Sequence, residues 1–182
     1  MSEIADRIGA AAYRSSRPVA VTAVDGPGGA GKSTFASRLA DALGGVPIVH
    51  TDDFASWDQP LVWWPRLIEQ VLQPLATGTR ARYQRYNWVT RSLDDWIDID
   101  ARHIILEGVG ANRLAFAPYV TFAIWIDTPR AVRLARGLER DGAAMAEQWS
   151  IWMAAEDDYI ERESPDARAD LVISGHPGVA GA

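Results

Sequence analysis

Short apolar runs alternate with longer amphipathic segments along most of the chain. Five runs rich in valine, isoleucine and leucine have the length and composition of buried strands, and we expect strands at residues 19–24, 46–50, 103–107, 120–127 and 169–173. Between these runs apolar residues recur every three or four positions, which predicts helices at residues 3–14, 33–43, 61–75 and 129–162. Strands that alternate with helices predict an α/β fold with a parallel sheet between two layers of helices.

Residues 77–91 fit neither pattern. They contain strand-forming residues without a clean apolar face, which predicts an exposed hairpin or loop. The chain of 182 residues has the length of one domain. We therefore expect a single domain over residues 1–182, with an acceptor-side insert at about 55–100 and a lid at about 133–148. The last helical stretch should break near Gly142.

The most specific motif lies between the first predicted strand and the helix after it. The segment from Gly26 to Ser33 reads G-x-x-x-x-G-K-S, the phosphate-binding loop, in the strand–loop–helix context that this motif requires. Backbone N–H groups of such a loop surround a polyphosphate, and glycines let the chain approach it closely. The lysine reaches the β- and γ-phosphates, and the serine hydroxyl binds Mg²⁺. We expect nucleotide contacts from Gly26, Gly28, Gly29, Ala30, Gly31, Lys32, Ser33 and Thr34.

Composition strengthens the assignment of this loop. The 18 basic residues are 17 arginines and one lysine, and that lysine is Lys32. A compact ammonium fits between two phosphates where a planar guanidinium does not. The N-K-x-D motif of guanine-nucleotide switches is excluded, because it needs a second lysine.

Charge and cysteine content restrict the partners. A net charge of −6 and an isoelectric point near 5.0 argue against broad nucleic-acid binding, which needs a basic face. Without cysteine the chain has no disulfide framework, thiolate nucleophile or zinc knuckle. No apolar run approaches the ~20 residues of a membrane span, and the first residues lack a signal-peptide core, so we expect a cytoplasmic protein with no membrane partner. A homo-oligomer is compatible with the sequence.

Carboxylates follow two predicted strands at the edge where the phosphate-binding loop lies. Asp52 and Asp53 come after the second strand, and either could orient an acceptor hydroxyl and take its proton. Neighbouring residues on a strand point to opposite sides, so we expect only one to be the base, while the other binds substrate or caps the next helix. Glu107 ends the third strand, where an NTPase places an acid near Mg²⁺; the alternative is an ordinary turn acid. The expected metal ligands are Ser33, Asp52 and Glu107.

Three arginines share one face of the long predicted helix, because Arg133, Arg136 and Arg140 lie three and four positions apart. Guanidiniums on one face could close over the phosphates as charge develops. We expect Arg133 and Arg136 to bind nucleotide, and Arg136 and Arg140 to assist catalysis. The alternative is a solvated face that pairs with Glu139 or Asp141.

Aromatic residues and arginines alternate in the insert. This combination suits a nucleobase, a sugar or a second phosphate, although an ordinary exposed loop can have the same composition. The expected substrate contacts are Asp53, Asp58, Tyr83, Tyr86, Trp88 and Arg91, and the other arginines available for a second phosphate site are Arg80, Arg82 and Arg85. His176 lies in the loop after the last strand, where a purine ring could rest; a surface-turn histidine is the alternative.

In order along residues 19–175, the chain resembles the uridine kinase family of P-loop kinases, which also includes phosphoribulokinase and pantothenate kinase. The phosphate-binding loop and the lid-helix pattern R-L-x-R-x-x-x-R-D at residues 133–141 are specific matches. Shorter matches are Asp52-Asp53-Phe54 for D-S-F, Trp57-Asp58-Gln59-Pro60 for aromatic-D-x-P, Tyr86-Asn87-Trp88-Val89 for Y-D-F-V, Glu107-Gly108-Val109 for E-G-I, and the closing strand 169–173.

This resemblance implies roles for the matched residues. They are Asp52 as the general base, Asp58 at the ribose hydroxyls, Tyr86 near the nucleobase, Glu107 at the magnesium, and Arg133, Arg136 and Arg140 around the phosphates. Three departures concern the acceptor: Asn87 replaces an acid, Arg91 stands where a uridine kinase has a base-contacting histidine, and the lid continues after Asp141 without a charged segment. These three departures argue against a strict specificity for uridine, and they leave the expected kinase chemistry unchanged.

The sequence thus predicts a three-layer P-loop NTPase fold, with a five-stranded parallel sheet in the order 2-3-1-4-5 and a short lid. The expected activity is ATP- and Mg²⁺-dependent phosphorylation of a small hydroxyl acceptor, most simply the 5′-hydroxyl of a nucleoside, with GTP open as the donor. Two alternatives stand beside it: a nucleoside monophosphate kinase, and an ATP-binding regulatory or ATPase module.

Overall fold

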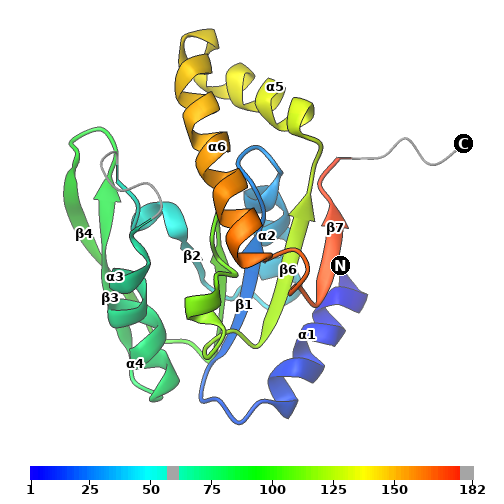
Figure 1. Cartoon of the computed structure of the whole chain (residues 1–182). Helices are drawn as coiled ribbons and strands as arrows, with labels where there is room; N and C mark the ends of the chain where they lie inside the picture. The colour runs from blue at the N-terminus through cyan, green and yellow to red at the C-terminus, as the bar shows by residue number, and fades with distance from the viewer. Residues whose placement is uncertain (57–61, 177–182) are drawn as a thin grey trace, which may run out of the picture.

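Five parallel strands form the centre of the computed structural model, which describes residues 1–56 and 62–176 (Figure 1). The strands are β1 (Ala20–Asp25), β2 (Ile48–His50), β5 (His103–Glu107), β6 (Phe122–Asp127) and β7 (Leu171–Ser174), in the sheet order β2-β5-β1-β6-β7. Counted along the chain without two separate hairpin strands, this is the predicted order 2-3-1-4-5. Every pairing in the sheet is parallel, so the carboxyl ends meet at one edge, where α/β proteins bind ligands.

The two faces of the sheet are covered by different layers, because successive strand residues point to opposite sides. On one face, Val24, Ile105 and Ile124 pack in a cluster with residues of α1 (Ser2–Arg14) and α2 (Lys32–Ala42). On the other face, Ile104 and Leu106 pack with residues of a helical stretch at 64–76. The predicted three-layer α/β architecture is confirmed.

The helix expected at 61–75 is a helical stretch with a wide turn in its middle. α3 (Trp64–Leu67) continues through a π-helical turn, η2 (Ile68–Leu72), into α4 (Gln73–Ala76). Pro65 stands in the first turn, where a helix does not need its N–H. Pro74 has no N–H for the hydrogen-bond ladder, and the π-helical turn directly precedes it, as is common where that ladder is interrupted.

Residues 77–91 contribute to a hairpin, β3 (Ala81–Asn87) with β4 (Ser92–Ile99), which is separate from the main sheet. The expectation that this stretch has no apolar face needs correction. Ala81 and Tyr83 are buried, while Arg82 between them is exposed. The alternation was hidden because the pairing register shifts between Gln84 and Tyr86, which reverses the side to which later residues point.

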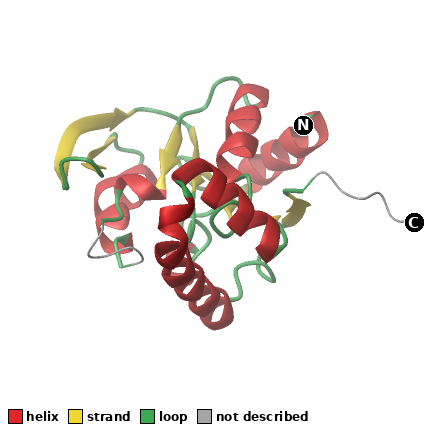
Figure 2. Ribbon diagram, turned by 90° about the horizontal axis from the view of Figure 1, so that it is seen from above, coloured by secondary structure: helices red, strands yellow, loops and turns green. Residues whose placement is uncertain are grey.

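Two helices stand above the carboxyl ends of the strands (Figures 1 and 2). α5 (Arg130–Asp141) leads through a short 3₁₀ turn, η4 (Ala143–Met145), into α6 (Ala146–Glu163). Gly142 separates them with φ of +94°, a conformation that favours glycine, so the predicted break lies where expected. Within the described residues, no helix combines the length and apolarity of a membrane span.

Candidate active site

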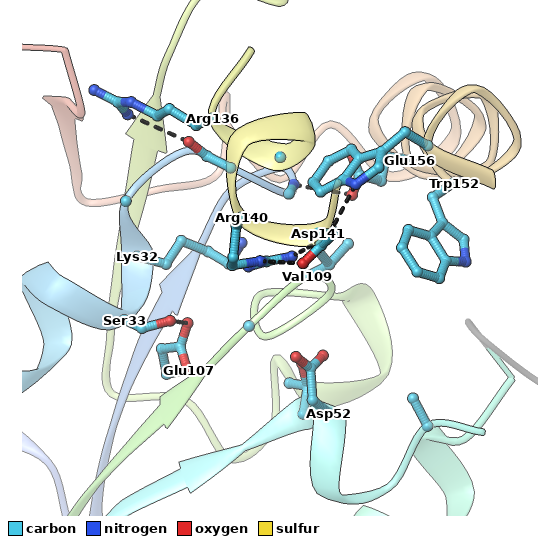
Figure 3. Close-up of a pocket in the computed structure, with 18 of the residues that line it drawn as sticks. Lys32, Ser33, Asp52, Glu107, Val109, Arg136, Arg140, Asp141, Trp152 and Glu156 are labelled. Carbon is cyan, nitrogen blue, oxygen red and sulfur yellow. Dashed lines mark hydrogen bonds and ion pairs between the residues drawn. The ribbon is translucent and has the colours of Figure 1, made fainter. Parts of the chain in front are cut away.

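A cleft of about 830 Å³ opens at the carboxyl edge of the sheet (Figure 3). One wall is the loop between β1 and α2, and the opposite wall is the 3₁₀ turn η1 (Thr51–Asp53) that follows β2. α5 and α6 lie above both. Gly108, after β5, has φ of +138°, and a Cβ there would lie 1.8 Å from Thr51 Oγ1. A glycine is therefore required for η1 to approach the end of β5.

The loop at 26–31 has the conformation that a phosphate-binding loop needs. Gly26, Gly29 and Gly31 have φ of +147°, +73° and +98°. A Cβ on Gly26 would lie 2.6 Å from the Ile126 carbonyl oxygen, and one on Gly29 would lie 2.5 Å from the carbonyl oxygen of Arg133. Side chains at these positions would collide with backbone, so the glycines are fixed by packing as well as by φ.

Most of the expected nucleotide-binding residues line the cleft, and the rest support the loop. The lining residues are Gly28, Gly29, Gly31, Lys32, Ser33 and Thr34. Lys32 begins α2, and its Nζ donates to the Pro27 carbonyl (3.0 Å), which holds the ammonium over the loop. Gly26 and Ala30 lie outside the lining; Ala30 is fully buried and its carbonyl accepts a hydrogen bond from Thr128 Oγ1 (3.0 Å).

Ser33 and Glu107 form a set of oxygen donors beside Lys32. Ser33 Oγ donates to Glu107 Oε1 (3.1 Å), and His50 Nδ1 lies 2.6 Å from Glu107 Oε2. Burial alone would raise the pKa of Glu107, but the hydrogen bond from His50 and the charge of Lys32 outweigh it and lower that pKa. The same hydrogen bond raises the pKa of His50. His50 was not predicted; its only signal was its place next to Thr51-Asp52.

This donor set fits Mg²⁺, which prefers oxygen ligands and commonly takes one or two from the protein, with the rest from phosphates and water. Glu107 is 4% exposed and kept ionised by its neighbours. Throughout residues 1–56 and 62–176, no group of three or more His, Cys, Asp or Glu side chains could hold a metal ion. An Mg²⁺ at Ser33 and Glu107 would therefore need its other ligands from phosphates and water.

Asp52 and Asp53 point to different places. Asp52 lines the cleft and is exposed to it (Figure 3). The protein that surrounds the cleft raises the pKa of its carboxyl, and Lys32 partly offsets the rise. Asp53 Oδ2 instead accepts a hydrogen bond from Tyr83 (2.8 Å), whose ring is 2% exposed and stacks on Phe54. This pair joins η1 to the hairpin behind the cleft wall and does not line the cleft, and the substrate contacts expected from Asp53 and Tyr83 stay predictions.

The three lid arginines also lie in different environments. Arg136 lines the cleft and donates to the carbonyls of Gly29 (3.3 Å) and Gly175 (3.1 Å). Arg140 lines it as well. Arg133 is buried under the loop, donates to the Thr128 carbonyl (3.1 Å) and pairs with Glu156 (3.2 Å). The side chain is enclosed by α6 and does not line the cleft, and its expected phosphate contact stays a prediction.

The acceptor side is aromatic. Trp88 lines the cleft, and its Nε1 donates to the backbone carbonyl of Asp52 (3.2 Å). Tyr86 meets Trp88 edge to face, with ring centroids 5.3 Å apart, and does not line the cleft. Arg91 is exposed in the hairpin turn with φ of +55°. Asp58 lies outside the described residues.

The other hairpin arginines are on the outer side of the molecule. Arg80 pairs with Asp100 (2.7 Å), and Arg82 pairs with Asp98 (3.4 Å) and stacks over Trp96. Neither they nor Arg85 are among the residues that line the cleft. His176, after β7, does not line it either; the carbonyl of its neighbour Gly175 accepts a hydrogen bond from Arg136.

Sequence reasoning missed the residues of α6 that face the loop. Glu156 is buried, and its Oε1 accepts a hydrogen bond from the Gly28 N–H (2.9 Å); burial raises the pKa of this carboxyl, and the Gly28 N–H opposes the rise. Trp149 and Trp152 also line the cleft. The helical spacing of these residues does not distinguish a cleft-facing side from a core-facing one.

Comparisons with known proteins identify the fold and the family of the chain. Three solved structures share the fold: a possible uridine kinase from Bacillus stearothermophilus (24% identity, 94% of this chain and 99% of that chain, TM-score 0.66), a candidate fructose transport system kinase from Silicibacter sp. TM1040 (19%, 94% and 98%, 0.73), and D-glycerate 3-kinase from Cryptococcus neoformans (12%, 98% and 97%, 0.65). No curated protein matches the chain significantly. The model of the phosphoribulokinase / uridine kinase family matches residues 64–180, which is more than half of the sequence. The chain therefore belongs to the phosphoribulokinase / uridine kinase family.

Proposed function

We propose that this protein is an ATP- and Mg²⁺-dependent kinase that transfers the γ-phosphoryl group to a hydroxyl of a nucleoside-like acceptor. The observation that carries the proposal is the position of Asp52, a carboxylate that lines the same cleft as Lys32 and Ser33 but comes from the opposite wall. Phosphoryl transfer to an alcohol needs this arrangement, with phosphate ligands on one side and a proton acceptor on the other.

The chemistry assigned to the chain's own residues is simple. The acceptor oxygen forms a bond to the γ-phosphorus as the bond between that phosphorus and the leaving oxygen of ADP breaks, and the acceptor proton passes to Asp52. The raised pKa of Asp52 makes it a stronger base than an ordinary aspartate. Lys32, Arg136 and Arg140 neutralise charge on the phosphates. A bound Mg²⁺, held by Ser33 and Glu107, would share in that neutralisation.

The distribution of charge supports an acceptor without a phosphate of its own. Among the described lining residues the basic ones are Lys32, Arg136 and Arg140, which all come from the nucleotide side. The acceptor side offers Asp52 with Ala55, Trp63 and Trp88. A nucleoside monophosphate kinase would need a second phosphate site. Of the four arginines available for it, Arg80 and Arg82 are paired with acids elsewhere, and neither Arg85 nor Arg91 lines the cleft.

Structural neighbours extend the range of acceptors worth testing. Two carry names that refer to fructose and D-glycerate, and likeness at this level of identity concerns the fold. A neutral sugar fits the aromatic acceptor side as a nucleoside does, since both present an apolar face and several hydroxyls. The acidic glycerate lacks a basic partner among the described residues of that side.

The test compares transfer to neutral acceptors and to their phosphates. A coupled assay with Mg·ATP would screen uridine, cytidine, ribose and fructose beside the matching monophosphates. Asp52→Asn should lower kcat by at least about a hundredfold with ATP affinity nearly unchanged. Asp53→Asn is the matched control: it leaves the cleft lining intact and should retain most turnover. Full turnover in Asp52→Asn would refute the assignment of the base, and ATP hydrolysis unaffected by every acceptor would favour an ATPase module.

A further inference from the structure

We propose that Asp141 and Trp149 are positioning residues that hold the guanidinium of Arg140 in its place above the cleft. This inference rests on the proposed function, because it assigns a task to Arg140 during phosphoryl transfer. We call these three residues the Arg140 clasp. Arg140 and Asp141 come from α5 (Figure 3) and Trp149 comes from α6, and all three line the cleft.

The first part of the clasp is a two-point ion pair. Arg140 Nε donates to Asp141 Oδ1 (2.7 Å), and Nη2 donates to Asp141 Oδ2 (2.8 Å). Two parallel hydrogen bonds fix the plane of a guanidinium and not only its distance. The pairing uses one edge of the guanidinium, so Nη1 is left to face a phosphoryl oxygen. Arg140 is 68% exposed and Asp141 24%, so without the carboxylate the arginine would be a loose surface side chain.

The second part fixes the carboxylate itself. Trp149 Nε1 donates to Asp141 Oδ2 (3.0 Å), and the Arg140 guanidinium carbon lies 5.8 Å from the centre of the Trp149 ring. Asp141 is the last residue of α5, next to Gly142, where a side chain would otherwise change rotamer freely. The indole therefore ties the end of α5 to α6.

The third part fixes the indole. A Cβ on Gly137 would lie 2.3 Å from the Trp149 ring, and a Cβ on Gly28 would lie 3.2 Å from it. The ring is thus seated against a helix backbone on one side and the phosphate-binding loop on the other, and it is 2% exposed. A glycine inside a helix is destabilising relative to alanine, and at Gly137 the close approach of the ring leaves no room for a Cβ.

An ion pair that only joins α5 to α6 would not need the contacts among Arg140, Asp141 and Trp149. Arg130 and Asp157 form an ion pair between α5 and α6, are 53% and 51% exposed, and do not line the cleft. That pair joins the same helices without fixing any cleft residue. The clasp differs because each member limits the freedom of the next, from the loop at Gly28 through Trp149 and Asp141 to Arg140.

Electrostatics agrees with a permanently ionised pair. The hydrogen bond from Arg140 lowers the pKa of Asp141, and the hydrogen bond to Asp141 raises the pKa of Arg140. The charge of Asp52 also raises the pKa of Arg140, although less than Asp141 does. The guanidinium is therefore attracted toward Asp52 as well, while its hydrogen bonds are made to Asp141.

The experiment compares Asp141→Asn, Trp149→Phe and Arg140→Ala with Asp157→Asn as the matched control on the same helix pair. Arg140→Ala should lower kcat by about a hundredfold. Asp141→Asn should lower kcat by about tenfold, because a guanidinium out of place loses much of its effect, while KM for ATP changes less than about threefold. Trp149→Phe keeps the ring, loses the N–H and should show a smaller decrease of the same kind. Asp157→Asn should match the wild type.

A second readout needs no acceptor. Binding of ADP with aluminium fluoride, a mimic of the phosphoryl group in transfer, should weaken about tenfold in Asp141→Asn, while binding of ADP alone is retained. A residue that only stabilises the fold would weaken both ligands together, or lower the melting temperature without this difference. If Asp141→Asn folds poorly, Trp149→Phe carries the same test.

The outcomes separate the two levels of the proposal. Wild-type turnover and wild-type binding of the aluminium fluoride complex in Arg140→Ala would remove Arg140 from the proposed mechanism. Loss in Arg140→Ala, with kcat and complex binding unchanged in both Asp141→Asn and Trp149→Phe, would overturn the clasp and leave the proposed function standing.

Discussion

Neighbouring residues of the same type have different environments at this site. Asp52 lines the cleft, whereas Asp53 holds Tyr83 behind it. The alternation of side chains predicted that only one of the two could face the ligand, but not which one. That choice depends on where the hairpin supplies a hydroxyl partner, and the sequence around 77–91 has no pattern strong enough to place Tyr83 in the core.

Trp88 is the residue on the acceptor side with the clearest role in our proposal. It lines the cleft and is anchored to the Asp52 carbonyl, so its ring can stack on an acceptor. Stacking on an aromatic ring is worth about 1–3 kcal/mol per base, so Trp88→Ala should raise KM for the acceptor about 10- to 100-fold. KM for ATP should stay unchanged, because the substitution leaves the phosphate-binding loop intact. Steady-state kinetics with each substrate varied in turn would measure both.

Trp96 provides the control for this prediction. It belongs to the same hairpin, is 47% exposed and stacks under Arg82 outside the cleft. Trp96→Ala removes the same side chain from the same hairpin and should leave both KM values unchanged. Equal effects of the two substitutions would mean that Trp88 acts through hairpin stability and not through contact with the acceptor.

At the scale of elements, local motifs were predictable and contacts between distant segments were not. The phosphate-binding loop was found because the residues that bind phosphate lie within eight consecutive positions. The role of Arg133 was not, because three arginines on one helical face are equivalent until the partner of that face is known. The packing of α6 distinguishes them, because Glu156 of α6 pairs with Arg133, whereas Arg136 and Arg140 line the cleft.

The link from α6 to the loop leads to a stability prediction. Glu156→Gln keeps an oxygen for the Gly28 N–H but leaves Arg133 buried without its charge partner. Removing one member of a buried ion pair typically costs about 3–5 kcal/mol, so chemical denaturation should show a large loss in the free energy of unfolding. Glu161→Gln, at an exposed position of the same helix, should change it little. A loss below about 1 kcal/mol in Glu156→Gln would mean that the pair contributes no more than a surface ion pair.

At the scale of the whole molecule, the parallel sheet followed from the alternation of strands and helices, and its order followed from the resemblance to P-loop kinases. Together they set the edge where the site lies. The contacts that connect the segments above that edge were not predictable. They converge on Asp25, the last residue of β1, which is fully buried. It accepts hydrogen bonds from the N–H groups of Gly26 (2.7 Å) and Asn112 (2.7 Å) and from the hydroxyl of Tyr159 (2.7 Å).

A single carboxylate therefore connects the phosphate-binding loop, the segment after β5 and α6, and its loss should affect all three. Asp25→Asn places an N–H among groups that are themselves donors, and unsatisfied buried groups cost about 1–3 kcal/mol each. At about 2–4 °C per kcal/mol for a chain of this size, the melting temperature should fall by roughly 5–15 °C. Tyr159→Phe removes one donor and leaves the N–H groups of Gly26, Gly110 and Asn112 in place, so it should cost a fraction of that.

Asp166→Asn, at an exposed aspartate near the end of α6, is the control for these two variants. It shows whether a fall in stability comes from the hydrogen bonds of Asp25 or from the loss of any negative charge. Differential scanning calorimetry would give the three melting temperatures, and titration with ATP would give the three affinities. If Asp25 joins the layers, affinity should fall along with stability in Asp25→Asn, because the first residue of the loop is bound to this carboxylate. A variant that melts early yet binds ATP as tightly as the wild type would show that the loop keeps its shape without β1's last residue, and that Lys32 and the glycines alone preserve the nucleotide site.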